Sequence, residues 1–177
     1  MRILFIALLA LTATAQSPRE RDTIPEPAKD ARTLQGRQLA VTLSQSALSA
    51  APGAKLALYA DVLPKPKMHV YAPEQTGGYI RIELTLDDDA AVVEGKPVFP
   101  KASDYYFEPL DETFKVFDAP FRIRQDITIA STPALRRRAS AGETLTLTGT
   151  LRYQACDDQV CYRPDQVKLT WNIALRR

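Results

Sequence analysis

The sequence predicts an all-β, immunoglobulin-like β-sandwich, and three observations carry this prediction. Apolar and polar residues alternate in many short segments after about residue 38. No long segment has the spacing of an amphipathic helix, and 13 prolines punctuate the chain. Some eight short strands separated by proline-containing turns are typical of a sandwich rather than of an α/β sheet. A chain of 177 residues has room for one such domain with its own core.

The predicted strands are the segments in which alternate residues are apolar. The first two cover residues 39–43 and 56–62, and a third, 80–86, follows a turn at Gly77 and Gly78. Shorter strands are predicted around Val92 and Val116 and over 121–123 and 127–129. The clearest pair comes last, because residues 145–155 and 167–175 each place apolar side chains on one face. We expect these two segments to form a long terminal hairpin.

The N-terminal residues have the pattern of an export signal. A basic start at Arg2 precedes the apolar run 3–11 and an Ala-x-Ala cleavage site, so residues 1–15 are expected to be a cleaved signal peptide. The run is too short to cross a bilayer, and we expect no membrane insertion of the mature chain. Residues 16–37 are charged, proline-rich and poor in apolar side chains, which predicts a flexible leader before a single domain over 38–177.

The charge pattern gives no support for nucleic-acid binding. The net charge is +2, from 23 basic and 21 acidic side chains, so no strong field surrounds the protein. The basic triplet 136–138 is expected in a solvated loop. The acidic run 87–89 lacks the glycine and distal glutamate of a calcium loop and is expected to form a polar turn.

The chain has two cysteines, Cys156 and Cys161, in the connection of the terminal hairpin. In an exported protein such a pair can be a structural bridge, an exchanging disulfide, or part of a metal site. A bridge across so short a loop stabilises the fold by only about 2 kcal/mol, which favours exchange over a structural role. A solvent-facing tip would also admit an attacking thiolate. A metal site would need His69, the single histidine, as a third ligand.

The flanking charges distinguish the two sulfur atoms. Asp157 and Asp158 adjoin Cys156 and should disfavour its thiolate, whereas Arg163 lies two residues beyond Cys161 and should favour one. We therefore expect Cys161 to be the more reactive thiol and Cys156 the resolving thiol.

The segments around the cysteines, 153–156 and 161–164, resemble the disulfide hairpin of the amino-terminal periplasmic domain of the thiol:disulfide interchange protein DsbD. Segments 66–73 and 78–80 are similar to an early part of that family. Further similarity lies in 99–101, 105–110 and 116–117. The resemblance extends from about residue 38 to the end of the chain.

The resemblance implies an immunoglobulin-like fold and a protein-disulfide reductase component without a cofactor or metal. It implies that the second cysteine, Cys161, forms the mixed disulfide with partners. It also implies an aromatic cap, which by position is formed by Tyr105, Tyr106 and Phe107, with Phe107 the first choice for the shielding ring. Tyr71 and His69 are expected to line the pocket of the pair or to pack in the core.

The partners implied by the resemblance are a membrane-embedded thiol–disulfide electron donor and periplasmic thioredoxin-fold or other thiol proteins. The sequence departs from the family in having four residues between the cysteines, one fewer than is usual, and in having Arg163 where a proline is common. Because no membrane segment follows the domain, we expect the donor to be a separate protein.

A non-catalytic function is the alternative. An exported immunoglobulin-like binding or assembly module would use the same bridge only to stiffen a recognition loop. Hydrolytic catalysis is not indicated, because the single histidine has no accompanying serine and acid in a triad pattern.

Overall fold

The computed structural model describes residues 31–177, and the predicted signal peptide and most of the predicted leader lie outside this range. The described chain consists mainly of strands, with one α-helix and one short 3-10 helix. The elements are β1 Arg32–Gln35, β2 Leu39–Gln45, β3 Ser49–Ala50, β4 Lys55–Pro64, β5 His69–Tyr71, β6 Glu83–Leu86, β7 Val92–Glu94, β8 Ser103–Phe107, η1 Glu108–Leu110, β9 Glu112–Phe117, β10 Phe121–Ile129, α1 Pro133–Ser140, β11 Thr144–Tyr153, β12 Ala155–Cys156 and β13 Asp165–Leu175.

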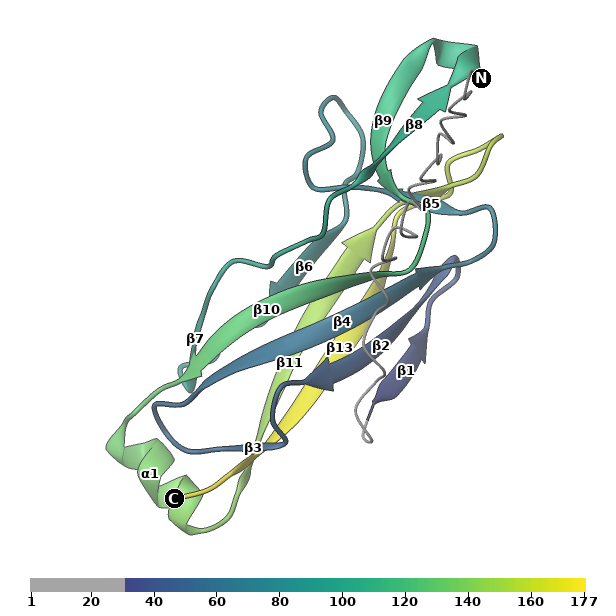
Figure 1. Ribbon diagram of the computed structural model, residues 1–177. Coiled ribbons are helices and arrows are strands. Elements are labelled where there is room, and N and C mark those ends of the chain that lie inside the picture. Colours follow the sequence, from purple (N-terminus) through teal and green to yellow (C-terminus); the bar gives the residue numbers. More distant parts are fainter. Residues whose placement is uncertain (1–30) are drawn as a thin grey trace, which may run out of the picture.

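Two sheets form the predicted sandwich. One has the strand order β1-β2-β4-β10-β7 and the other has the order β3-β13-β11-β6. In Figure 1 the long strands β4 and β10 of one sheet and β11 and β13 of the other run along the length of the molecule. Alternate residues of these strands are buried, as expected when each sheet has one face toward a common core. Trp171 of β13 is buried in this core, and its indole N–H donates to the carbonyl of Tyr59 at 3.4 Å.

A third sheet, with the order β12-β5-β9-β8, lies at one end of the sandwich. The hairpin of β8 and β9 projects beyond the long strands, and α1 lies at the opposite end of the molecule (Figure 1). β12 belongs to the connection between β11 and β13 and pairs with β5. The third sheet therefore attaches the cysteine-containing connection to the projecting hairpin.

The predicted terminal hairpin is confirmed. β11 and β13 pair over ten residues, from Thr144 opposite Ala174 to Tyr153 opposite Asp165. The two short strands predicted over 121–123 and 127–129 are one continuous strand, β10, because Arg124–Asp126 continue the ladder with β4. The strand predicted over 80–86 begins only at Glu83.

Two parts of the structure differ from the sequence predictions. Residues 32–35, which were assigned to the leader, form the edge strand β1, whose Leu34 packs against the core opposite Val41. The basic triplet 136–138 lies on α1 rather than in a loop. α1 begins after Thr132, whose side chain accepts a hydrogen bond from the Leu135 amide, and the helix buries Leu135 and Ala139. Both elements are too short to give a clear periodic pattern.

No helix among residues 31–177 combines the length and apolar character required to cross a membrane.

Candidate functional site

Cys156 and Cys161 form a disulfide at the sandwich end that carries the third sheet. Cys156 is the last residue of β12 and lies opposite His69 of β5. Cys161 pairs back onto Cys156, so the four residues between the cysteines form a tight turn. The local fold therefore brings the two sulfur atoms together between the terminal hairpin and the projecting one.

Asp157 stabilises this turn. Its Oδ1 accepts hydrogen bonds from the amides of Gln159 and Val160, both at 2.8 Å, and its Oδ2 accepts one from the Tyr162 hydroxyl at 2.8 Å. These hydrogen bonds lower the pKa of Asp157, and the two backbone amides contribute most to the shift. The carboxylate therefore stays ionised. The turn is thus stabilised by hydrogen bonds in addition to the bridge.

The two cysteines differ in their exposure to solvent. Cys156 is 2% exposed, whereas Cys161 is an exposed residue. The sequence analysis expected the whole pair to face solvent at a hairpin tip. That expectation is wrong for Cys156, because β12 pairs with β5 and is covered by the aromatic residues of the third sheet.

The Tyr71 hydroxyl lies 3.6 Å from the Sγ atoms of both cysteines. Since a disulfide sulfur carries no hydrogen, the hydroxyl is the donor in either contact. Burial raises the pKa of Tyr71, and the nearby carboxylate of Glu112 raises it further, so the hydroxyl keeps its proton at neutral pH. Tyr71 therefore presents a hydrogen-bond donor to the bridge from the buried side.

Aromatic rings from β8 pack against the buried cluster that contains Cys156. Tyr105 and Phe107 are half-buried, stack with their ring centroids 6.4 Å apart, and line a pocket of about 120 Å³ together with the two cysteines. Tyr106, between them, lies outside the pocket lining and is 58% exposed. Its hydroxyl donates to Asp111 at 2.9 Å within the same hairpin. The alternation of side chains along a strand explains this separation.

His69 lies in the wall of this pocket and is 5% exposed. Its ring centroid is 4.6 Å from that of Tyr105. Burial lowers the pKa of His69, and the carboxylates of Asp158, Asp118 and Asp157 oppose this shift. The imidazole is therefore neutral at pH 7 and packs as a ring beneath Tyr105.

The sequence analysis also considered a metal site, and residues 31–177 contain no set of side chains arranged to hold a metal ion. Cys156 and Cys161 are bonded to each other, so neither is available as a thiolate ligand in this state. No group of three histidine, cysteine or acidic side chains in this part of the chain is arranged to hold an ion.

Several site residues were not identified from the sequence. Tyr79 and Phe114 pack with their ring centroids 4.9 Å apart, and both contact Tyr71. The Tyr79 hydroxyl donates to Glu112 at 2.7 Å. Leu110 and Val160, both largely exposed, complete the rim of the pocket. The alternation of β9 could have indicated Phe114, but Tyr79 lies in a segment without regular structure and gave no such signal.

The Tyr105 hydroxyl donates to Asp158 at 2.9 Å. This contact was also missed, because it joins positions 53 residues apart. It links the projecting hairpin directly to the turn between the cysteines.

The fold and the site together define a β-sandwich domain with a half-exposed disulfide in an aromatic pocket. The family described as "Thiol:disulfide interchange protein DsbD, N-terminal" matches residues 37–172, and the chain belongs to this family. The family and the fold expected from the sequence are thereby confirmed, and thiol–disulfide interchange is the chemistry associated with the family.

Among solved structures, the chain is similar to the N-terminal periplasmic domain of ScsB from Proteus mirabilis. The two share 13% sequence identity with a TM-score of 0.47, and the alignment covers 81% of this chain and 50% of that chain. The chain thus spans about half the length of that structure. No curated protein matches the chain.

Proposed function

We propose that this chain is an exported, periplasmic thiol–disulfide interchange domain. In this proposal, residues 1–15 are the cleaved signal peptide, and the Cys156–Cys161 pair relays reducing equivalents between a membrane-embedded donor and periplasmic thiol proteins. The asymmetry of the bridge is the observation that carries the proposal. Cys161 is exposed, whereas Cys156 is buried and within 3.6 Å of the Tyr71 hydroxyl.

The oxidised domain would accept electrons in two steps. A thiolate of the donor attacks Sγ of Cys161, the S–S bond breaks, and Cys156 leaves as a thiolate that takes up a proton. The donor's second thiolate then attacks the donor sulfur of the mixed disulfide and releases Cys161 as a thiolate, which takes up the second proton. The donor departs as a disulfide, and the domain has gained two electrons and two protons.

The reduced domain would pass these electrons to a client by the same chemistry. The Cys161 thiolate attacks the client's disulfide and forms a mixed disulfide, and one client sulfur leaves as a thiolate. The Cys156 thiolate then attacks Sγ of Cys161, which restores the internal bridge and releases the reduced client. Exposure of Cys161 and burial of Cys156 support this order, because only Cys161 is open to a large partner.

Tyr71 would assist both directions. When the bridge opens, negative charge develops on Cys156 in a buried position where water cannot stabilise it. The Tyr71 hydroxyl is already 3.6 Å from that sulfur and keeps its proton, so it can donate to the developing thiolate.

The aromatic cap is part of the proposal. Phe107 and Tyr105 shield the bridge, His69 supports Tyr105 from below, and the hairpin moves aside when a partner arrives. Shielding of this kind would protect the reduced pair from small oxidants between exchange partners. Tyr106, although part of the predicted cap, faces away and would not contribute to shielding.

Electron transfer to a thioredoxin-fold protein tests the proposal. The domain is reduced, freed of reductant and mixed with an oxidised thioredoxin, and the thiols are counted after acid quenching and alkylation with a mass-shifting maleimide. We expect loss of two thiols from the domain for each two gained by thioredoxin, and no transfer from the Cys161→Ser variant. If the domain kept its thiols, the pair would be structural and the non-catalytic binding module would be the better description.

A further inference from the structure

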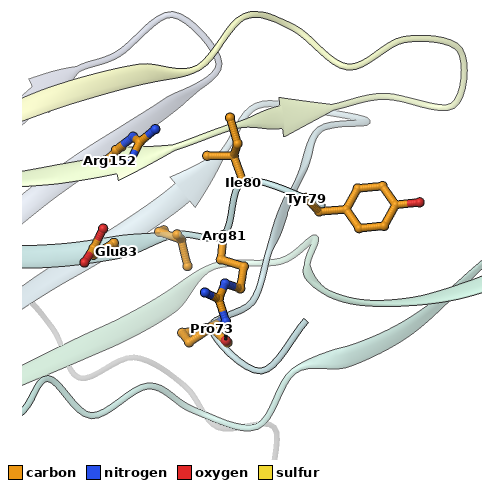
Figure 2. Close-up of a pocket in the computed structure, with 7 residues that line it drawn as sticks. Pro73, Tyr79, Ile80, Arg81, Glu83 and Arg152 are labelled. Atoms are coloured by element: carbon orange, nitrogen blue, oxygen red, sulfur yellow. Dashed lines mark hydrogen bonds between the residues drawn. The ribbon is translucent and has the colours of Figure 1, made fainter. Parts of the chain in front are cut away.

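A second pocket lies beside the disulfide pocket, and the two share Tyr79 as a wall. Its volume is about 440 Å³. It is lined by the segment that leads from β5 into β6 and by Arg152 of β11 (Figure 2). Its lining includes Tyr79 and Pro73 and three charged side chains, Arg81, Glu83 and Arg152. We call this hollow the arginine pocket.

Tyr79 separates the two pockets. Its ring packs on Tyr71 with the centroids 4.8 Å apart, and its hydroxyl donates to Glu112 of β9. In Figure 2 this ring points away from the side chains of Arg81 and Arg152. One face of the segment thus belongs to the disulfide pocket and the other to the arginine pocket, and Tyr79 is the residue that lines both.

The arginine pocket has a surplus of positive charge. Arg81 donates to the carbonyl of Pro73 at 3.3 Å, which leaves most of its guanidinium donors available. Within residues 31–177, neither Arg81 nor Arg152 has an ion-pair partner within 4.0 Å. Glu83 lies opposite Arg152 in the β6–β11 ladder and is the one carboxylate in the lining. Two cations therefore face one anion.

Carboxylates lie on and next to the wall of the disulfide pocket. Asp157 lines it, and Asp158 and Glu112 accept hydrogen bonds from the lining residues Tyr105 and Tyr79. These groups repel an acidic side chain placed next to the attacking sulfur of a partner. An acidic side chain farther from the partner's reactive sulfur, across Tyr79, would instead lie next to Arg81 and Arg152 of the arginine pocket.

We propose that the arginine pocket binds a carboxylate side chain on the extended segment that flanks the reactive cysteine of the partner thiol protein. The inference rests on the proposed function, because it assigns part of the partner-binding surface of the same site. Guanidinium groups form paired hydrogen bonds with carboxylates, so Arg81 and Arg152 each offer a charged partner to an acidic side chain that enters the pocket. The contact would select among thiol partners by charge and would orient the partner across Tyr79.

Two synthetic dithiol peptides with the same Cys-x-x-Cys core test this inference. One has glutamates separated from the core by neutral residues, and the other has glutamine at those positions. The rate at which each reduces the full oxidised chain is followed by acid quenching and mass spectrometry, with dithiothreitol as an uncharged reductant. The Arg81→Ala/Arg152→Ala double variant is compared with Arg137→Ala/Arg177→Ala, which removes the same charge elsewhere on the chain.

We expect the glutamate peptide to react about twofold to fivefold faster than the glutamine peptide with the natural chain. High salt and the Arg81→Ala/Arg152→Ala variant should abolish this preference, whereas the control variant should retain it. Equal rates for both peptides, or a preference that survives in the double variant, would overturn the inference while leaving exchange with dithiothreitol intact. A bridge that reacted with neither peptides nor dithiothreitol would overturn the proposed function as well.

Discussion

The Tyr105 hydroxyl donates to Oδ1 of Asp158 at 2.9 Å, and this hydrogen bond joins the projecting hairpin to the turn between the two cysteines. The two elements are otherwise connected through the strands β5 and β9. Any opening of the hairpin away from the bridge has to break this bond. In the proposed function, this bond therefore holds the aromatic cap closed over the bridge.

Removing this hydrogen bond should expose the bridge. The Tyr105→Phe variant keeps the ring over His69 but cannot donate to Asp158, so the hairpin should open more often. A hydrogen bond with a net value of about 1 kcal/mol corresponds to a roughly fivefold change in an opening equilibrium. We expect dithiothreitol to reduce the bridge roughly fivefold faster in this variant than in the natural chain.

Tyr106→Phe is the matched control for this prediction. It also removes a hydroxyl that donates to an aspartate at 2.9 Å, but its partner, Asp111, lies within the same hairpin. The rate of reduction should therefore not change. Equal acceleration in both variants would show that general loosening of the hairpin, and not the Tyr105–Asp158 bond, controls access.

The Tyr71 hydroxyl should accelerate the exchange itself. In the Tyr71→Phe variant the Cys156 thiolate loses the Tyr71 hydroxyl as a donor, and hydrogen bonds to charged groups contribute about 1.5 to 3 kcal/mol. We expect exchange with an oxidised thioredoxin to slow by roughly tenfold or more, with little change in the urea midpoint of unfolding. Tyr79→Phe, which loses only its bond to Glu112, should keep most of the rate.

The two thiols of the reduced domain should differ in reactivity. Cys161 is exposed and lies near Arg163, whereas Cys156 is buried beside Asp157. Iodoacetamide should therefore alkylate Cys161 well before Cys156 at neutral pH, as peptide mapping of a time course would reveal. Faster labelling of Cys156 would reverse the assignment of the attacking and resolving residues.

The stability of the domain should depend on the protonation of His69, the single histidine of the chain. Burial lowers its pKa below 6.5 in the folded domain, whereas the unfolded chain takes up a proton near pH 6.5. The unfolded state thus binds more protons in this range, and the free energy of unfolding should decrease as the pH falls from above 6.5 toward the folded-state pKa. Above pH 6.5 this contribution is fully present.

Urea unfolding of the oxidised domain at a series of pH values from about 8 to about 5.5 would measure this effect, because this range spans the histidine pKa of about 6.5 in the unfolded chain. The His69→Gln variant should lose the slope in this window even if its overall stability is lower. A variant with the same slope as the natural chain would show that other groups cause the pH dependence.

The sequence was sufficient to predict the sandwich and the position of the redox pair. The alternation in β11 and β13 identified the terminal hairpin. Cys156 and Cys161 lie between these two segments in the sequence, which placed the pair in the connection of the hairpin. These features are local, because each depends on residues close together in the chain. The resemblance to the DsbD family added Tyr105 and Phe107 of β8, which line the pocket of the pair, but it also included Tyr106, which lies outside that pocket.

The rest of the site depends on long-range contacts that sequence patterns do not encode. Tyr79 reaches Tyr71 and Phe114 because the segment between β5 and β6 folds back over β9. The burial of Cys156 requires β12 to pair with β5. The paired residues, Cys156 and His69, lie far apart in the sequence. Such contacts follow from the topology and not from local propensity.

The reduction potential of the Cys156–Cys161 bridge, measured in glutathione and dithiothreitol redox buffers with the thiol state read after acid quenching, tests the exchange function most directly. A bridge that exchanges with partner proteins should have a potential clearly above about −300 mV. A potential below about −300 mV would mark an inert structural bridge and would contradict the proposed relay.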